Sequence, residues 1–286
     1  MVKELAGFDF SQVQLALFCA GEAVAAEYVP RATAAGCVVI DSSARFRDDP
    51  AVPLVIPEVN PQAIAGYTAR NLVASPDATT VQLLVALKSL YDTVGIERLN
   101  IATYQAVSGS GKAGVKELAG QTANLLNARP LENRIYDRQI AFNALARVEP
   151  LEDNGYTRAE MNLVRESRKI LADESLPINP TAVRVPVFYG HGMAVHLETR
   201  DKLGATQARA LLQQAPGITV MDEMRDDGYP SAVTDAANDN AVLVGRIRED
   251  ISHPRGLDLW IVSDNARKGG ALNSVQIAEI LVKDYL

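Results

Sequence analysis

The sequence predicts an α/β fold with parallel strands, because short apolar segments alternate with helical ones. Residues 13–19 form an apolar run that ends at Ala20 and Gly21, residues 22–35 have helical character, and residues 37–40 are apolar again. A strand, a helix and a second strand in this order form a βαβ unit, whose right-handed crossover makes the strands parallel. The 286 residues are enough for one large domain or two ordinary ones.

The next elements extend this pattern. Strands are predicted at residues 52–56 and 72–74, and Ser75-Pro76-Asp77 is typical of a helix start, because a cap residue precedes a proline and an acid. Residues 194–198 alternate between apolar and polar side chains, which indicates a sheet with one solvated face. The remaining predicted elements are strands at 99–107, 183–189, 194–197, 218–221, 241–247 and 257–262, and helices at 78–91, 112–127, 158–173, 206–214 and 272–286.

Composition and charge exclude several classes of protein. A net charge of −7 argues against a broad phosphate-binding surface, so we expect no nucleic acid partner. No apolar run approaches the ~20 residues of a membrane helix, and the first residues lack the regions of a signal peptide. Two cysteines, Cys19 and Cys37, and three histidines give no disulfide framework and no metal site. We therefore expect a cytoplasmic protein without a metal.

One glycine-rich segment matches a nucleotide-binding pattern. Residues 109–114 read Gly-Ser-Gly-Lys-Ala-Gly between a predicted strand and a predicted helix. This is the spacing of a dinucleotide fingerprint, but no acidic residue ends a strand about 20 residues later. Ala113 also stands where a phosphate-binding Walker loop needs Ser or Thr. The pattern favours an ordinary glycine-rich turn between a strand and a helix.

Several charged residues have a structural and a functional interpretation. Glu166 and Lys169 lie three positions apart on a predicted helix and share a face, which is typical of a solvated ion pair. In a straight strand Arg184 and His191 would be more than about 20 Å apart, whereas a bend at the proline and glycines between them could bring them together. Arg47 alone is typical of a surface loop.

Taken together, these segments resemble one family over nearly the whole chain, the aspartate-semialdehyde dehydrogenases. The matching segments are residues 8–11, 39–43, 57–61, 103–109, 139–143, 153–157, 184–191 and 263–269. The resemblance implies NADPH-dependent reduction of L-aspartyl 4-phosphate to the semialdehyde and phosphate, a step that leads to lysine, threonine and methionine. It also implies a partial Rossmann domain (residues 1–80 with a returning C-terminal helix, 264–286) and an α/β domain (81–263) whose mixed sheet forms a homodimer.

The resemblance also assigns a site for a small anionic substrate. Arg47 and Lys169 would hold the substrate phosphate. Glu166 and Arg184 would hold the amino acid end, since a guanidinium suits bidentate binding of a carboxylate. We expect these four side chains and His191 to point into one cleft.

The remaining roles concern the chemistry and the cofactor. Gln105 would orient the acyl intermediate, and His191 would act as the acid and base, a task that suits a group titrating near neutrality. Ala20, Gly21 and Asn265 would contact NADP.

The nucleophile of the family is missing from the matching segment. The family has a cysteine at a helix N-terminus in an Asn-Pro-x-Cys segment, whereas this chain has Ala78 after Ser75-Pro76-Asp77. A methyl group cannot form a thioester, and the hydroxyls of Thr79 and Thr80 are far weaker nucleophiles. Cys19 matches a family serine beside the cofactor, so we do not expect it to replace the nucleophile.

The start of the chain is a second departure. The family begins with a strand, a glycine-rich phosphate loop and a helix, a unit of ~30 residues or more that does not precede Lys3 here. We therefore expect weak binding of NADPH and an impaired dehydrogenase. The alternative is a non-catalytic dimeric homologue that binds a ligand or a partner protein. A designed cysteine-to-alanine change explains Ala78 less well, because Ser75 and Asp77 differ from the family segment too.

Overall fold

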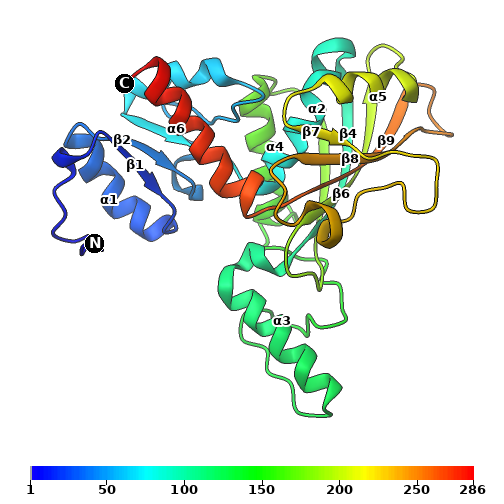
Figure 1. Cartoon of the computed structure of the whole chain (residues 1–286), viewed down its shortest axis with the longest axis horizontal. Coiled ribbons are helices and arrows are strands. Elements are labelled where there is room, and N and C mark those ends of the chain that lie inside the picture. Colours follow the sequence, from blue (N-terminus) through cyan, green and yellow to red (C-terminus); the bar gives the residue numbers. More distant parts are fainter. Residues whose placement is uncertain (1) are drawn as a thin grey trace.

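The chain is organised around two separate sheets, as a computed structural model that describes residues 2–286 shows (Figure 1). The smaller sheet is parallel and has the order β1-β2-β3, with strands β1 (Leu15–Phe18), β2 (Val38–Asp41) and β3 (Leu72–Ala74). The larger sheet has the order β5-β4-β6-β9-β8-β7, with strands β4 (Ile96–Gln105), β5 (Ile178–Arg184), β6 (His191–Thr199), β7 (Ile218–Val220), β8 (Val242–Glu249) and β9 (Gly256–Ser263). The predicted α/β class with a parallel and a mixed sheet is confirmed.

Helices cover both faces of the smaller sheet. Val39 points into the same apolar cluster as Val29 of α1 (Glu22–Ala34), while Ile40 packs with Ile277 of α6 (Asn273–Asp284). Every residue of β2 is buried, as expected for a parallel strand covered on two sides. The C-terminal helix therefore returns to the first sheet, where it lies beside the blue and cyan elements in Figure 1.

The larger sheet has one apolar and one solvated face. In β6, Met193, Val195 and Leu197 are buried, whereas Ala194 is exposed and His196 is half-buried, so the predicted alternation is confirmed. The buried face packs against helices α2 (Ala78–Val94), α4 (Arg158–Leu171) and α5 (Ala205–Gln214). Helix α3 (Gly111–Leu126) instead projects away from both sheets (Figure 1).

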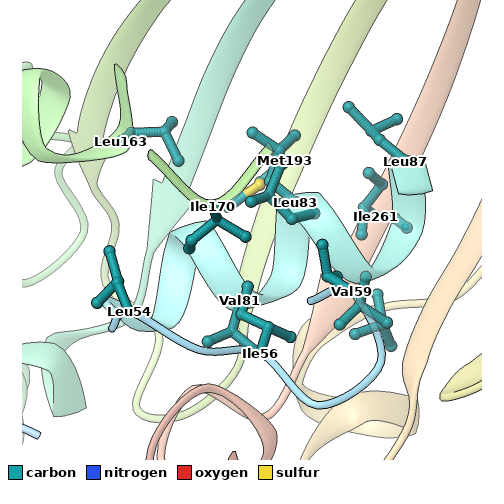
Figure 2. Close-up of a cluster of buried hydrophobic side chains, with 14 of the residues drawn as sticks. Leu54, Ile56, Val59, Val81, Leu83, Leu87, Leu163, Ile170, Met193 and Ile261 are labelled. Atoms are coloured by element: carbon teal, nitrogen blue, oxygen red, sulfur yellow. The ribbon is translucent and has the colours of Figure 1, made fainter. Parts of the chain in front are cut away.

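Helix α2 lies between the two parts of the chain. Figure 2 shows Val81, Leu83 and Leu87 of this helix among side chains from both sides. Leu54, Ile56 and Val59 come from the loop after β2, whereas Leu163, Ile170, Met193 and Ile261 come from α4 and the larger sheet. All residues from Thr79 to Leu87 are buried, so this part of the helix is buried on its whole circumference and has no solvated face.

Several predicted boundaries are wrong. Residues 52–56 form only an isolated bridge between Leu54 and Ala74, because the Asn60 side chain takes the Ile56 N–H and the Leu54 carbonyl at 2.9 Å each. The strand expected at 183–189 is β5, which begins earlier and ends at Arg184, since Pro186 has no N–H for a sheet. The cap of α2 is Asp77 and not Ser75.

We expect Gly269 to be sensitive to the smallest side chain. Gly269 lies in the short helical turn after β9, and a Cβ there would be 2.4 Å from the Cβ of Ala78. Gly269→Ala should therefore lower the free energy of unfolding by about 1–3 kcal/mol through overpacking, measured by urea denaturation. Gly120→Ala in α3 is the matched control: a Cβ there meets nothing within 4 Å, so it should raise stability by about 0.5–1 kcal/mol. Equal effects of the two substitutions would contradict the contact.

Candidate active site

The N-terminus of α2 is the centre of the candidate site. Ala78 is the first residue of the helix, and the Asp77 carboxylate caps it by accepting hydrogen bonds from the Thr79 N–H at 2.9 Å and the Thr79 hydroxyl at 2.6 Å. The Thr80 hydroxyl donates to Glu166 at 2.7 Å. Both threonine hydroxyls are therefore engaged, and position 78 has only a methyl group.

A buried ion pair holds this helix start. Glu166 of α4 is 2% exposed and accepts a hydrogen bond from Nη1 of Arg47 at 3.0 Å. Its other oxygen accepts from the backbone N–H of Asp77 at 2.8 Å and from Thr80. The structure therefore brings Glu166 and Arg47 together beside Ala78, and both oxygens of Glu166 are bonded to the protein.

Two cations near Glu166, Arg47 and Lys169, also donate to backbone carbonyls. Arg47 donates from Nε to Ser75 O at 3.1 Å and from Nη2 to Ser42 O at 2.8 Å. The Lys169 ammonium donates to the carbonyls of Arg47 and Asp49, both at 2.7 Å. In this structure Lys169 stabilises the loop after β2, and Arg47 ties that loop to α4 and to the residues before α2.

The electrostatics of this group follow from burial. Burial raises the pKa of the Glu166 carboxyl, although the Arg47 charge opposes the shift. Burial acts on Asp77 in the same direction, but Arg47, 3.7 Å away, and the hydrogen bonds from Thr79 hold the pKa of Asp77 below its ordinary value. The Asp77 carboxylate at the helix start is therefore ionised at neutral pH.

Arg184 and His191 meet at the backbone of residue 106. Nη1 of Arg184 donates to the Ala106 carbonyl at 2.7 Å, and the Ala106 N–H donates to Nδ1 of His191 at 3.1 Å. The bend that the sequence allowed between them is present: β5 ends at Arg184, and the chain returns in β6 at His191. Gly109 makes room for both, since a Cβ there would be 2.7 Å from Arg184 Nη1 and 3.5 Å from His191 Cε1.

His191 is neutral in this environment. Burial and the neighbouring Arg184 charge lower its pKa to about 3, and its exposed fraction is 3%. Nδ1 accepts the Ala106 N–H, so the proton of the neutral ring is on Nε2. The ring can donate one proton from that atom, but with this lowered pKa it does not titrate near neutrality.

Gln105 and Asn265 lie at strand ends close to this pair. Gln105 ends β4 and donates to the Thr103 hydroxyl at 3.2 Å. Asn265 follows β9; its oxygen accepts from the Gly190 N–H at 3.0 Å, and its nitrogen donates to the Ser108 hydroxyl at 3.0 Å. Asn265 thus joins the loop before β6 to the loop after β4.

Ala20 and Gly21 lie apart from these groups, in the exposed turn between β1 and α1. Gly21 has a φ of +84° and caps α1 without a side-chain hydrogen bond, so N–H groups of the first turn are free. Such a turn fits a phosphate, although the carboxylate of Glu22 begins the same helix. Glu22 is 3.6 Å from Arg158 of α4, which links the two parts of the chain near this turn.

Sequence reasoning missed two polar residues that organise the site. Asp77 supplies the cap and the charge described above. Gln82 is fully buried in α2 and donates to the carbonyls of His191 at 3.1 Å and Ile261 at 3.0 Å. A glutamine within the apolar run 81–87 is the signal that could have identified it, because a buried amide needs partners.

The glycine-rich segment 109–114 is a turn into α3, as expected: residues 107–110 form a short 3₁₀ helix and Gly111 begins α3. Among residues 2–286, no group of histidine, cysteine and acidic side chains is arranged to hold a metal ion. None of the helices in the described part of the chain has both the length and the apolar character to cross a bilayer.

Two family profiles match the two parts of the chain. The one described as semialdehyde dehydrogenase, NAD binding domain, matches residues 1–67, and the one described as semialdehyde dehydrogenase, dimerisation domain, matches residues 87–268. The fold is therefore that of a semialdehyde dehydrogenase, with a nucleotide-binding part before a dimerisation part.

Individual relatives narrow this class. An aspartate-semialdehyde dehydrogenase of Legionella pneumophila is 55% identical over 285 residues, which cover 100% of this chain and 82% of the relative. The crystal structure of aspartate semialdehyde dehydrogenase II of Vibrio cholerae complexed with ASA superposes with a TM-score of 0.97 at 53% identity, over 99% of this chain and 84% of that one. A probable aspartate-semialdehyde dehydrogenase of Pseudomonas aeruginosa gives 0.94 at 40% identity, with the same coverage. The chain belongs to the aspartate-semialdehyde dehydrogenase family, so the resemblance is confirmed.

We expect His191 to make the free energy of unfolding decrease at acidic pH. Its folded pKa lies below the ordinary 6.5, so between pH 6.5 and about 3 the unfolded chain binds a proton that the folded chain does not, and stability is lost as the pH falls. His191→Gln should remove on the order of 1–2 kcal/mol of the stability difference between pH 7 and pH 5, measured by urea unfolding. The same pH dependence in both proteins would show that another group is responsible.

Proposed function

We propose that this chain is an impaired NADP-dependent aspartate-semialdehyde dehydrogenase of the cytoplasm. Its ancestral reaction is the reductive dephosphorylation of L-aspartyl 4-phosphate to the semialdehyde, a step of lysine, threonine and methionine synthesis. One observation carries the proposal: a methyl group stands at residue 78, the first position of α2, while the surrounding polar residues of the site are retained. Without a thiol at that position, no acyl group can be transferred to the enzyme.

The proposed roles divide between two groups of residues. Arg184 receives the carboxylate of the small anionic substrate, because it is buried and offers a planar fork of donors. Arg47 and Lys169, which lie beside the N-terminus of α2, contribute positive charge that attracts the substrate phosphate. Glu166 orients Arg47 through a hydrogen bond. The chain has a net charge of −7, so this local group of three cations makes the site a region of positive potential that attracts an anionic ligand.

The catalytic roles concern the groups around residue 106. His191 would hold a proton on Nε2 and give it to the oxygen of the reacting carbonyl group. Gln105, at the end of the neighbouring strand, would orient the acyl group through its amide. Both side chains are buried, so they would act in a site from which most water is excluded.

The cofactor site is proposed at Ala20, Gly21 and Asn265. The free N–H groups at the start of α1 suit a phosphate, and the Asn265 amide, held by Ser108, suits the carboxamide of the nicotinamide. Bound NADPH would supply the hydride for the reduction. We propose weak affinity, because the Glu22 carboxylate begins α1 and repels a phosphate at that turn.

The second candidate is a non-catalytic dimeric homologue that binds a ligand or a partner protein. One observation favours it. Glu166 accepts hydrogen bonds from the Asp77 N–H and from Thr80, and Lys169 donates to two backbone carbonyls, so both side chains stabilise the fold. These hydrogen bonds would stabilise the fold and preserve the charged site even in a protein that has no enzymatic activity.

Restoring the thiol tests between the two candidates. Ala78→Cys should give phosphate-dependent reduction of NADP with the semialdehyde, because the N-terminus of α2 stabilises a thiolate. The neighbouring Asp77 charge opposes that thiolate, so Asp77→Asn in addition should raise the rate further, by about 10-fold or more. Ala78→Ser is the matched control of similar size and should stay inactive. A folded but inactive Ala78→Cys protein would favour the non-catalytic role.

The oligomeric state can be tested directly. The larger sheet has a solvated face at β6 and β9, and residues 87–268 match a dimerisation domain, so we expect a homodimer. Light scattering at micromolar concentration should give twice the 30.8 kDa mass of one chain. A monomeric mass at that concentration would contradict the proposal.

A further inference from the structure

The Asp77 carboxylate lies between the start of α2 and the buried guanidinium of Arg47. Its Oδ1 accepts from the Thr79 N–H at 2.9 Å and from the Thr79 hydroxyl at 2.6 Å, and its Oδ2 is 3.7 Å from Nη1 of Arg47. A negative charge is favourable at this place, because the first N–H groups of a helix carry positive partial charge. The chain therefore supplies an anion of its own beside the cation that we propose for the substrate phosphate.

Asp77 is the exposed member of this group of charges. The exposed fraction of its side chain is 41%, against 10% for Arg47 and 2% for Glu166. Burial and the Arg184 charge lower the pKa of His191, and the Asp77 charge opposes them, so the carboxylate is within electrostatic reach of that ring. A ligand that approaches Arg47 from the solvent therefore encounters the Asp77 carboxylate.

The formal charges at the start of α2 are balanced within the chain. Arg47 and Lys169 carry two positive charges, and Glu166 and Asp77 carry two negative ones. Glu166 is fixed by hydrogen bonds from Arg47, the Asp77 N–H and Thr80, so its charge stays beside Arg47. A phosphate or sulfate would add up to two negative charges to this balanced group, and it would lie next to a carboxylate. Like charges repel more strongly in a partly buried site than in water.

We propose that Asp77 is an internal anion that occupies the charge site at the start of α2 and makes this chain select against phosphate-like dianions there. The inference rests on the proposed function in one respect, the placement of the substrate phosphate beside Arg47. It gives the impairment a second cause that is independent of the first. The missing thiol at Ala78 prevents acyl transfer, whereas Asp77 weakens the binding of the dianionic group.

Calorimetric titration of the full chain at low ionic strength tests this inference, with sulfate as the dianion and formate as the monoanion. Asp77→Asn should bind sulfate about 10-fold more tightly than the parent chain, because a negative charge beside the ligand is removed. The gain for formate should be about 3-fold, since the electrostatic free energy is proportional to the charge of the ligand. Asparagine caps a helix as well as aspartate does, so the start of α2 should be preserved.

Asp77→Ser separates the loss of charge from the new amide of asparagine. Serine also caps a helix start, but it has no NH₂ group that could donate to sulfate. The two variants should therefore show similar gains in sulfate affinity. Both should unfold cooperatively in urea, so that loss of the fold does not account for the result.

Asp9→Asn is the matched control. The Asp9 carboxylate has the same arrangement in an exposed turn, where it accepts from the Ser11 N–H at 3.0 Å and from the Ser11 hydroxyl at 2.7 Å. The substitution removes the same charge from the chain and keeps a cap. It should leave the affinity for sulfate unchanged, because Asp9 lies outside the site.

Three results would overturn the inference: no gain in sulfate affinity in Asp77→Asn, a gain that Asp77→Ser does not share, or an equal gain in Asp9→Asn. Failure of the proposed function is seen separately, as inactivity of the Ala78→Cys protein with and without Asp77→Asn, because sulfate binding does not need a thiol. An active Ala78→Cys protein in which Asp77→Asn leaves sulfate affinity unchanged would support the proposed function and overturn this inference alone.

Discussion

The burial of helix α2 on all sides is the constraint on which the site depends. Its apolar side chains pack both against the loop after β2 and against the larger sheet, so the helix cannot shift without disturbing either part (Figure 2). Gln82 adds polar restraints, because it binds the carbonyls of His191 and Ile261 and accepts from Ser263 at 3.1 Å. The position of residue 78 relative to His191 is therefore set by the packing of a core helix and not by a flexible loop.

The charged side chains around the start of α2 stabilise the fold through contacts within the protein. Arg47 and Glu166 are buried together, and removal of either would leave an unpaired charge in the interior. Lys169 holds the carbonyls of the loop that contains Arg47. Pairing of these charges therefore stabilises the fold whatever residue stands at position 78.

Arg184 differs from those residues because it lacks an ion-pair partner in the described chain. Its retention is not explained by the fold in the same way, since the Ala106 carbonyl accepts only one of its donors. A buried guanidinium with unused hydrogen-bond donors is suited to binding an anionic ligand. Arg47 and Arg184 are the same residue type and are both buried. Only their hydrogen-bond partners show that Arg47 is bonded within the protein and that Arg184 has donors left for a ligand.

The sequence by itself determined the α/β class, the alternation in β6, most helices and the family, because apolar periodicity and ordered motifs are local properties of the chain. It also predicted that Ala78 occupies the nucleophile position of the family, a prediction that rests on a local motif. Only the tertiary structure showed that Asn60 removes residues 52–56 from the sheet, that both oxygens of Glu166 are engaged, and that Arg184 and His191 meet at the backbone of residue 106. These contacts join residues up to 119 positions apart in the sequence, as for Arg47 and Glu166. A local sequence pattern does not specify which distant donor binds a given buried acceptor, because that depends on how the elements pack.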